Sequence, residues 1–110
     1  MSTVWKVLRT DDAKRDYTHI IRWTAERFGS QQTRIYKDTI KLALAALESG
    51  PNTLGVKQRN DLGDGILTLH VARNGRKGRH FIVFRIRGND TIEVLRLLYD
   101  GMELTDHFSP

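Results

Sequence analysis

The sequence predicts an α+β fold. We expect an N-terminal strand, an antiparallel two-helix hairpin on one face of a sheet of three or four mainly antiparallel strands, and a short C-terminal helix. Alternating apolar residues near the C-terminus indicate a β-hairpin. Two apolar stripes at helical spacing, separated by one glycine, indicate a helical hairpin. A further alternating segment lies between them, which gives the order β-α-α-β-β-β.

The β-hairpin is the strongest signal in the chain. Apolar residues recur at every second position of residues 82–87, as in a strand. The turn-forming residues 88–90 follow, and residues 91–99 are again rich in β-branched and aromatic side chains. A turn of this length sets the register. The expected pairs are Arg87–Thr91, Ile86–Ile92, Arg85–Glu93 and Phe84–Val94, which match apolar with apolar and cation with anion.

Both faces of this hairpin are apolar. One face is expected to carry Phe84, Ile86, Ile92 and Val94, and the other Phe81, Val83, Leu95 and Leu97. An antiparallel sheet with one face in water would be polar on that face. We therefore expect the helices to cover one face. We expect a partner protein, together with the short C-terminal tail, to cover much of the other.

The N-terminal half contains the two helices. Residues 4–9 have the composition of a short strand, and Thr10 or Asp11 is expected to cap the helix that follows. Gly29 is the expected end of the first helix, and residues 50–51 end the second. Helices joined by a single glycine should pack antiparallel. The expected buried stripes are Ala13, Tyr17, Ile20, Ile21, Thr24 and Phe28 in the first helix, and Ile35, Thr39, Leu42, Ala43, Ala46 and Leu47 in the second.

The rest of the chain supplies the remaining sheet and the tail. Residues 52–65 contain three glycines and predict a loop, and residues 66–71 alternate as a strand. Residues 74–78 predict a basic turn, and residues 102–108 a short helix. No linker and no internal repeat divides the chain, so residues 1–110 are expected to form a single domain.

The amino-acid composition indicates the cellular compartment in which the protein works. The chain has no cysteine, which excludes disulfides and zinc–thiolate sites and fits a reducing cytoplasm. The longest apolar run, Leu42–Leu47, is too short to cross a bilayer. The N-terminus lacks the apolar core of a signal peptide. We expect a cytoplasmic protein with no membrane segment.

Residues that could carry catalysis are sparse. None of the four histidines has metal-ligand spacing with another histidine or a carboxylate on one helical face. No nucleophile–base set, glycine-rich phosphate loop or pair of carboxylates is visible. We therefore expect no metal, no cofactor and no ordinary hydrolase or nucleotide-binding activity. Only His80 and His107 are plausible acid–base candidates.

The charge balance points to an acidic partner. Eighteen Lys and Arg against thirteen Asp and Glu give a net charge of +5. The densest cationic cluster is Arg73, Arg76, Lys77, Arg79 and His80, around one turn. Such a cluster could bind an RNA backbone or an acidic protein surface. The alternative is a solvated hairpin tip with protective charges. We take these five residues as candidates for binding a target.

Two sets of residues carry a family resemblance. The first set is Arg79, His80, Phe84, Arg85, Ile92, Arg96, Leu98, Met102, His107 and Phe108. The second is Arg59, Asp61, Leu62, Gly63, Asp64 and Gly65, which follow the predicted helical hairpin. In this order and spacing the chain resembles ParE-type toxins of the RelE/ParE superfamily over nearly its whole length. Each motif alone is weak, and their order and spacing together are fairly specific.

The resemblance implies a toxin of a type II toxin–antitoxin system. Such a toxin is held inactive in a hetero-oligomer with its cognate antitoxin, a small DNA-binding protein of, for example, the ribbon-helix-helix type. The antitoxin is expected to cover apolar surface on the helices and the sheet. The candidate antitoxin contacts are Tyr17, Ile21, Phe81, Val83, Leu95 and Leu97.

The resemblance leaves two targets open. ParE-like toxins poison DNA gyrase, and the C-terminal Met102 and His107 pattern favours this side, so a non-enzymatic gyrase inhibitor is the main expectation. RelE-like members cleave mRNA in the ribosome. Leu67, Tyr99 and the long loop at residues 73–78 depart from the family pattern and keep this alternative open. Its candidate catalytic residues are Arg85, Arg96, Tyr99 and His107, which would stabilise charge on the phosphate and move a proton.

Overall fold

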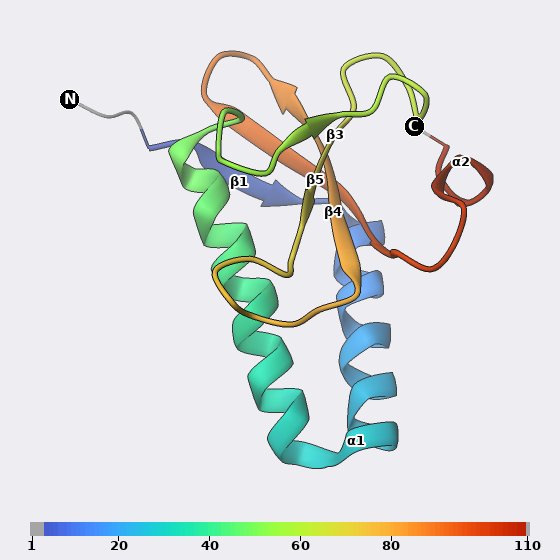
Figure 1. The fold of residues 1–110 in the computed structure, drawn as a ribbon. Helices are drawn as coiled ribbons and strands as arrows, with labels where there is room; N and C mark the ends of the chain where they lie inside the picture. Colours follow the sequence, from blue (N-terminus) through green and yellow to red (C-terminus); the bar gives the residue numbers. More distant parts are fainter. Residues whose placement is uncertain (1–3, 110) are drawn as a thin grey trace.

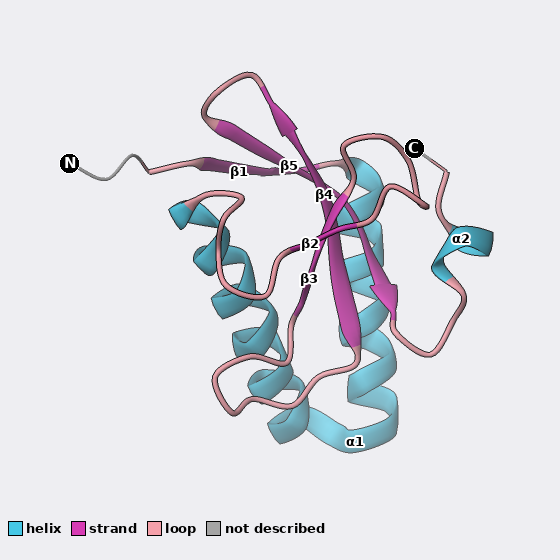
Figure 2. Ribbon diagram, turned by 45° about the horizontal axis from the view of Figure 1, so that its top comes forward, coloured by secondary structure: helices cyan, strands magenta, loops and turns pink. Residues whose placement is uncertain are grey.

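The computed structural model describes residues 4–109 and has the predicted α+β fold (Figure 1). The elements are β1 (Lys6–Arg9), α1 (Asp11–Ala46), a 3-10 turn (Leu47–Ser49), β2 (Lys57–Gln58), β3 (Leu67–His70), β4 (His80–Arg87), β5 (Thr91–Tyr99) and α2 (Leu104–His107). Helix α1 packs on one face of the sheet, and α2 packs against the other (Figure 2).

Helix α1 is bent into two arms at Gly29. The backbone of Gly29 has φ 83° and ψ 179°, a conformation that breaks the helix and favours glycine. The predicted end of the first helix is therefore confirmed. Thr10 is the N-cap, and its Oγ accepts a hydrogen bond from the Ala13 N–H at 3.1 Å. Both ribbon views show the arms antiparallel and side by side, so the helical hairpin is present (Figures 1 and 2).

The buried side of α1 differs in phase from the predicted stripes. Phe28, Ile35 and Leu42 are 60%, 45% and 54% exposed, although all three were expected in the core. Ile40 is fully buried instead. Both arms extend past the sheet near the bend, where Phe28 directly precedes Gly29, so no strand covers this end (Figure 1). Ile35 lies seven residues before Leu42 and therefore shares its side of the helix. Leu42 is exposed because the spacing of Ile40 and Leu47 places it on the opposite side of the helix.

Within residues 4–109 the sheet has five strands, in the order β1-β5-β4-β3-β2. Strand β1 pairs with β5 in parallel, and the other three pairings are antiparallel. The mainly antiparallel sheet is thus confirmed, with one strand more than the expected three or four. The additional strand is β2, which lies in a segment predicted to be loop. It is two residues long, too short to show the alternation that identifies strands.

The β4–β5 hairpin has the predicted register at its turn. All four expected pairs are present. The pairing then shifts between Val83 and Phe84, and Leu95 is left without a partner in β4, as in a β-bulge. A one-residue shift reverses which face the following side chains occupy. Leu97 therefore lies in the core under α1, with 4% exposed, which corrects its predicted place on the other face.

Each face of the sheet has its own hydrophobic core. The larger core lies between α1 and the sheet and includes Ile40, Leu47 and Phe84. The second core consists of Leu62, Ile66, Val83, Leu98, Leu104 and Phe108. The loop before β3 and the C-terminal tail thus cover the middle of this face together. This corrects the expectation that a partner protein is needed to cover much of it.

Candidate functional site

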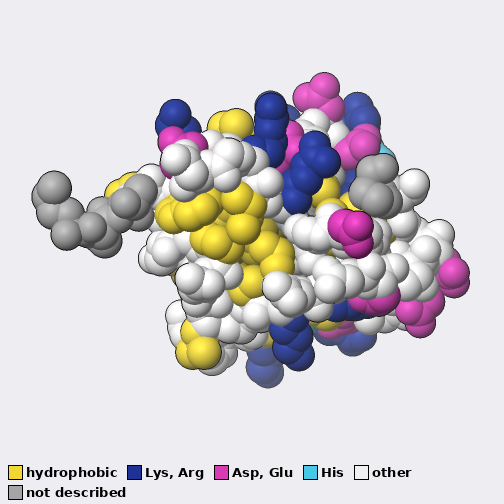
Figure 3. Space-filling model, turned by 90° about the horizontal axis from the view of Figure 1, so that it is seen from above, with side chains coloured by type: hydrophobic (Ala, Val, Ile, Leu, Met, Phe, Trp, Pro, Cys, Tyr) yellow, Lys and Arg dark blue, Asp and Glu magenta, His cyan; other side chains and the backbone are white. Residues whose placement is uncertain are grey.

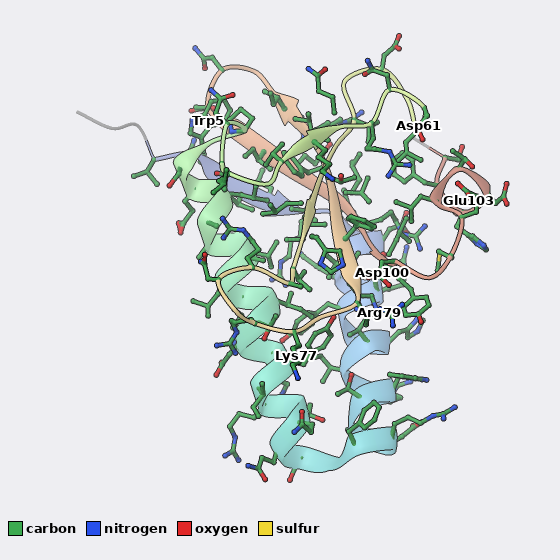
Figure 4. The ribbon with its side chains drawn as sticks, viewed as in Figure 1. Trp5, Asp61, Lys77, Arg79, Asp100 and Glu103 are labelled. Atoms are coloured by element: carbon green, nitrogen blue, oxygen red, sulfur yellow. The ribbon has the colours of Figure 1, made fainter. Side chains whose placement is uncertain are left out.

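A cluster of hydrogen-bonded polar side chains lies where β5 ends, with Arg79 and Asp100 close together (Figure 4). Asp100 Oδ1 accepts from Arg79 Nε at 2.7 Å, and Oδ2 lies 2.8 Å from His70 Nε2. The Ala72 N–H donates to His70 Nδ1 at 3.0 Å, so Nε2 carries the proton toward Asp100. Burial raises the pKa of Asp100, but the bonds from His70 and Arg79 outweigh it and hold the pKa below its ordinary value.

Tyr36 connects this cluster to the second arm of α1. Its hydroxyl accepts from the Arg79 N–H at 3.0 Å and lies 2.7 Å from His80 Nδ1. The hydroxyl proton is therefore available to donate to His80. Burial lowers the pKa of His80 to about 4, so this histidine is neutral at pH 7. Burial also raises the pKa of Tyr36. Two neutral side chains thus join α1 to the start of β4.

Sequence reasoning missed three members of the cluster: Tyr36, His70 and Asp100. Tyr36 and His80 are 44 residues apart, and His70 and Asp100 are 30 apart, so no local motif links them. The one usable signal is the β4–β5 pairing, which puts His80 opposite Tyr99 and therefore beside Asp100. The sequence predicts this pairing only if the position of the β-bulge at Leu95 is already known.

Two of the predicted target-binding residues hold the basic turn in place. Arg76 donates from Nε to Thr39 Oγ1 at 2.9 Å and from Nη2 to the Ile35 carbonyl at 3.1 Å. Arg73 donates to the Leu54 carbonyl at 3.3 Å. These contacts attach the turn to the second arm of α1 and to the loop before β2. They give both arginines a structural role.

The other three predicted target-binding residues differ from one another. The Arg79 guanidinium binds Asp100 and lies 5.2 Å from the centre of the Tyr99 ring. His80 is half-buried, and Lys77 is exposed (Figure 4). The predicted cluster is therefore divided between structural contacts and exposed charge. It does not present five cations on one surface.

The candidate ribonuclease residues do not converge. Arg85 pairs with Glu93 at 2.8 Å, and Arg96 pairs with Asp16 at 2.7 Å. Tyr99 lies opposite His80, five residues from Arg85 along β4, which is about 17 Å. His107 is exposed on α2. Two of the residues are paired with carboxylates, Tyr99 is distant from Arg85, and His107 lies on a separate helix. The four side chains therefore do not surround a common phosphate position.

Arg96 and Asp16 instead complete the edge of the sheet. Strand β1 pairs with β5 only as far as Val94, so the second half of β5 has no strand neighbour on its β1 side. Asp16 Oδ2 accepts the Leu97 N–H at 3.0 Å, and Thr10 Oγ donates to the Leu95 carbonyl at 2.9 Å. The first turns of α1 thus satisfy β5 backbone groups that β1 leaves unpaired.

Two of the six candidate antitoxin contacts are covered within the chain, and four are partly exposed. Val83 has no exposed surface and Leu97 is 4% exposed, so neither presents an area to a partner in this structure. Tyr17, Ile21, Phe81 and Leu95 are half-buried at the margins of the two cores. These four keep some surface available for contact.

A groove lined by both apolar and polar residues opens near the β4–β5 turn. It has a volume of about 440 Å³. Its lining residues are Pro51, Asn52, Thr53, Val56, Gln58, Asn60, Gly65, Ile66, Leu67 and Ile86. Figure 3 views the molecule from this end and shows hydrophobic side chains gathered in one patch. Ile86 is 42% exposed beside the groove. Sequence reasoning missed this site because its walls come from three separate segments.

One edge of β4 is open beside this groove. Strand β3 pairs with β4 only from Phe81 to Phe84, whereas β4 continues to Arg87. Residues 85–87 therefore have no strand neighbour on the β3 side. An open strand edge next to a groove can accept an extended peptide, which gains main-chain hydrogen bonds and side-chain pockets together.

Two further findings concern metal binding and membrane-spanning helices in the described part of the chain. Between residues 4 and 109, no three His, Cys, Asp or Glu side chains are arranged to hold a metal ion. None of the helices in the same range is both long enough and apolar enough to cross a membrane.

Comparison with known proteins identifies the class. A model of the family described as "ParE toxin of type II toxin-antitoxin system, parDE" matches residues 7–104. The match spans most of the chain, so the protein is a toxin of the type II toxin–antitoxin class. Within that class, the chain belongs to the ParE toxin family.

A solved structure has the same fold. A chain described as "Chromosomal ParDE TA system from P. aeruginosa" superposes with a TM-score of 0.70 at 19% sequence identity. The alignment covers 89% of this chain and 98% of that chain. No curated protein matches the sequence. This chain therefore shares the fold of that structure, and the comparison shows the fold alone.

Proposed function

We propose that this toxin inhibits DNA gyrase in the cytoplasm and is neutralised by direct binding of a cognate antitoxin. The family match over residues 7–104 is the observation that carries the proposal. The scattered positions of Arg85, Arg96, Tyr99 and His107 favour gyrase over the ribosome, because phosphate cleavage needs its acid, base and charge-stabilising groups around one atom.

We place the antitoxin on the open edge of β4. An extended segment that pairs with residues 85–87 would cover Ile86 and enter the groove. Lys57, Arg59, Arg85 and Arg87 lie in or beside the segments that form this region, and they outnumber Asp61 and Glu93, the two anions with which the three arginines pair. The segment should therefore alternate apolar and acidic residues. A ribbon-helix-helix protein with such a tail would give a hetero-oligomer of toxin and antitoxin.

Expression in a bacterial host tests the proposal. Induction of the toxin gene alone should stop growth, and co-expression of its antitoxin should restore it. Plasmids from arrested cells should lose negative supercoiling while mRNA stays intact. Arrest with cleaved mRNA and normal supercoiling would support the ribonuclease alternative. Normal growth at high expression would contradict both activities.

A further inference from the structure

The bend of α1 forms a projecting end that the sheet does not reach. Both ribbon views show the two arms continuing beyond the strands (Figures 1 and 2). Trp23 is 50% exposed and Phe28 is 60% exposed at this end. We call residues 22–37 the aromatic tip. Large aromatic side chains are usually buried or sit at interfaces, so two exposed ones close together indicate a binding surface.

The aromatic residues of this tip are already arranged. The Trp23 and Phe28 rings meet edge to face with their centres 5.8 Å apart. The Arg27 guanidinium lies 5.4 Å from the centre of the Trp23 ring. Such contacts hold side chains in place without burying them. A partner that binds here loses little side-chain freedom on docking, which favours affinity.

The backbone beneath these side chains is also fixed. Gly29 makes the sharp bend with its φ of 83°. Thr33 Oγ1 donates to the Gly29 carbonyl at 2.8 Å, just after the bend. Thr24 Oγ1 donates to the Ile20 carbonyl at 2.7 Å, just before it. Both threonines are buried. The backbone of the tip is therefore held in one conformation.

The charge of the tip selects the kind of partner. Residues 22–37 contain the cations Arg22, Arg27, Arg34 and Lys37 and the single anion Glu26. This segment therefore carries a net charge of +3, out of +5 for the whole chain. Trp and Arg are the residues that most often dominate binding energy in protein interfaces. The matching surface is an acidic protein face with an apolar socket.

We propose that the aromatic tip is the surface that contacts the target protein, DNA gyrase, at an acidic patch with an apolar socket. This inference rests on the proposed function. The tip and the groove beside the β4–β5 turn lie at opposite ends of the molecule (Figures 1 and 4). Target and antitoxin therefore use separate surfaces. An antitoxin shields the tip only if its chain continues along α1 from the groove.

The test compares a variant of the tip with a control variant at another exposed apolar residue. The first carries Trp23→Ala and Phe28→Ala. The control carries Leu54→Ala, an aliphatic residue that is 88% exposed far from the bend. Binding of each purified protein to gyrase is measured without DNA, together with antitoxin binding and the melting temperature. The tip variant should bind gyrase about 30-fold more weakly or worse, with antitoxin binding and melting temperature unchanged. The control should behave as wild type.

A charge variant tests the second half of the inference. Arg27→Glu should weaken gyrase binding and make it less sensitive to salt, because it removes a cation from the contact. Unchanged gyrase binding by both tip variants would overturn the proposal. Loss of antitoxin binding, or of binding to bare DNA, in place of gyrase binding would also overturn it.

Growth arrest separates this inference from the proposed function. If the wild-type toxin fails to bind gyrase, the proposed function and the gyrase assignment of the tip both fail. If the wild type binds gyrase and arrests growth, the Trp23→Ala, Phe28→Ala variant should lose the arrest at equal expression. Full arrest by this variant would overturn the role of the tip while leaving gyrase as the target.

Discussion

Asp100 is the residue on which the polar cluster depends. Its carboxylate accepts from Arg79 and His70, and its own N–H donates to the Arg79 carbonyl at 2.8 Å. Arg79 in turn donates its N–H to Tyr36 on α1. One carboxylate thus helps hold the ends of β3, β4 and β5 against the helix. The cluster is a structural junction, because its charged side chains, Arg79 and Asp100, pair with each other.

Replacing Asp100 by Asn should destabilise the fold. The amide cannot accept two charge-assisted bonds, so we expect a loss of about 1–2 kcal/mol in the free energy of unfolding. Urea unfolding at pH 7 measures it. Asp61→Asn is the control, because the Arg59–Asp61 pair is exposed and should contribute little. Equal stability of Asp100→Asn and wild type would contradict the role of Asp100.

His80 predicts a pH dependence of stability. Its pKa in the fold is about 4, below the 6.5 expected for the unfolded chain, so protons favour the unfolded state. This stabilisation is complete above pH 6.5 and is lost as the pH falls toward 4, by up to about 3 kcal/mol. His80→Gln removes the titration while keeping an acceptor for Tyr36. Urea unfolding of this variant should change less between pH 7 and pH 4.5 than that of wild type. Parallel curves would contradict this explanation.

At the level of elements, the chain combines a β-hairpin and a helical hairpin. The sequence predicted the register of the first better than the buried side of the second. The β4–β5 register was predictable because turn length and alternation fix it locally. The bulge at Leu95 was not, since it follows from how β5 packs against both cores. The phase of the second arm of α1 was misjudged because Leu42 and Ile35 fit a helical stripe equally well. Only the position of the sheet decides that Ile40 is the buried residue.

The bend of α1 depends on Gly29. A side chain at this residue would meet no atom within 4 Å, so the cost of substitution comes from the backbone angle alone. We expect Gly29→Ala to cost about 1–3 kcal/mol in the free energy of unfolding. Gln31→Ala, at an exposed helical position, should change it little. Thermal or urea unfolding measures both, and a Gly29→Ala protein as stable as wild type would show that the bend tolerates other residues.

The open edge of β4 makes a prediction about antitoxin binding. Ile86→Lys puts a charge where we place an apolar contact, so the toxin–antitoxin dissociation constant should rise on the order of tenfold or more. Leu54→Lys makes the same change outside the groove and should have no effect. Calorimetric titration with the antitoxin compares them. If Leu54→Lys weakens binding and Ile86→Lys does not, the antitoxin binds elsewhere.

At the level of the whole molecule, family and fold class could be predicted, whereas the site could not. The resemblance followed from residues in sequence order, such as Arg79 and Arg96. Their contacts depend on residues distant in the sequence, Asp100 and Asp16. The basic cluster looked continuous in sequence, but folding turns Arg73 and Arg76 toward the chain itself. An exposed cationic and aromatic surface lies instead at the bend of α1, where the sequence predicted a buried Phe28.

The most direct test of the central claim is a supercoiling assay with purified toxin, DNA gyrase, ATP and relaxed plasmid, with no ribosomes present. We predict that the toxin stops supercoiling in a concentration-dependent way and that stoichiometric antitoxin restores it. Full supercoiling at a large excess of folded toxin, with mRNA cleavage in a parallel ribosome assay, would contradict the claim.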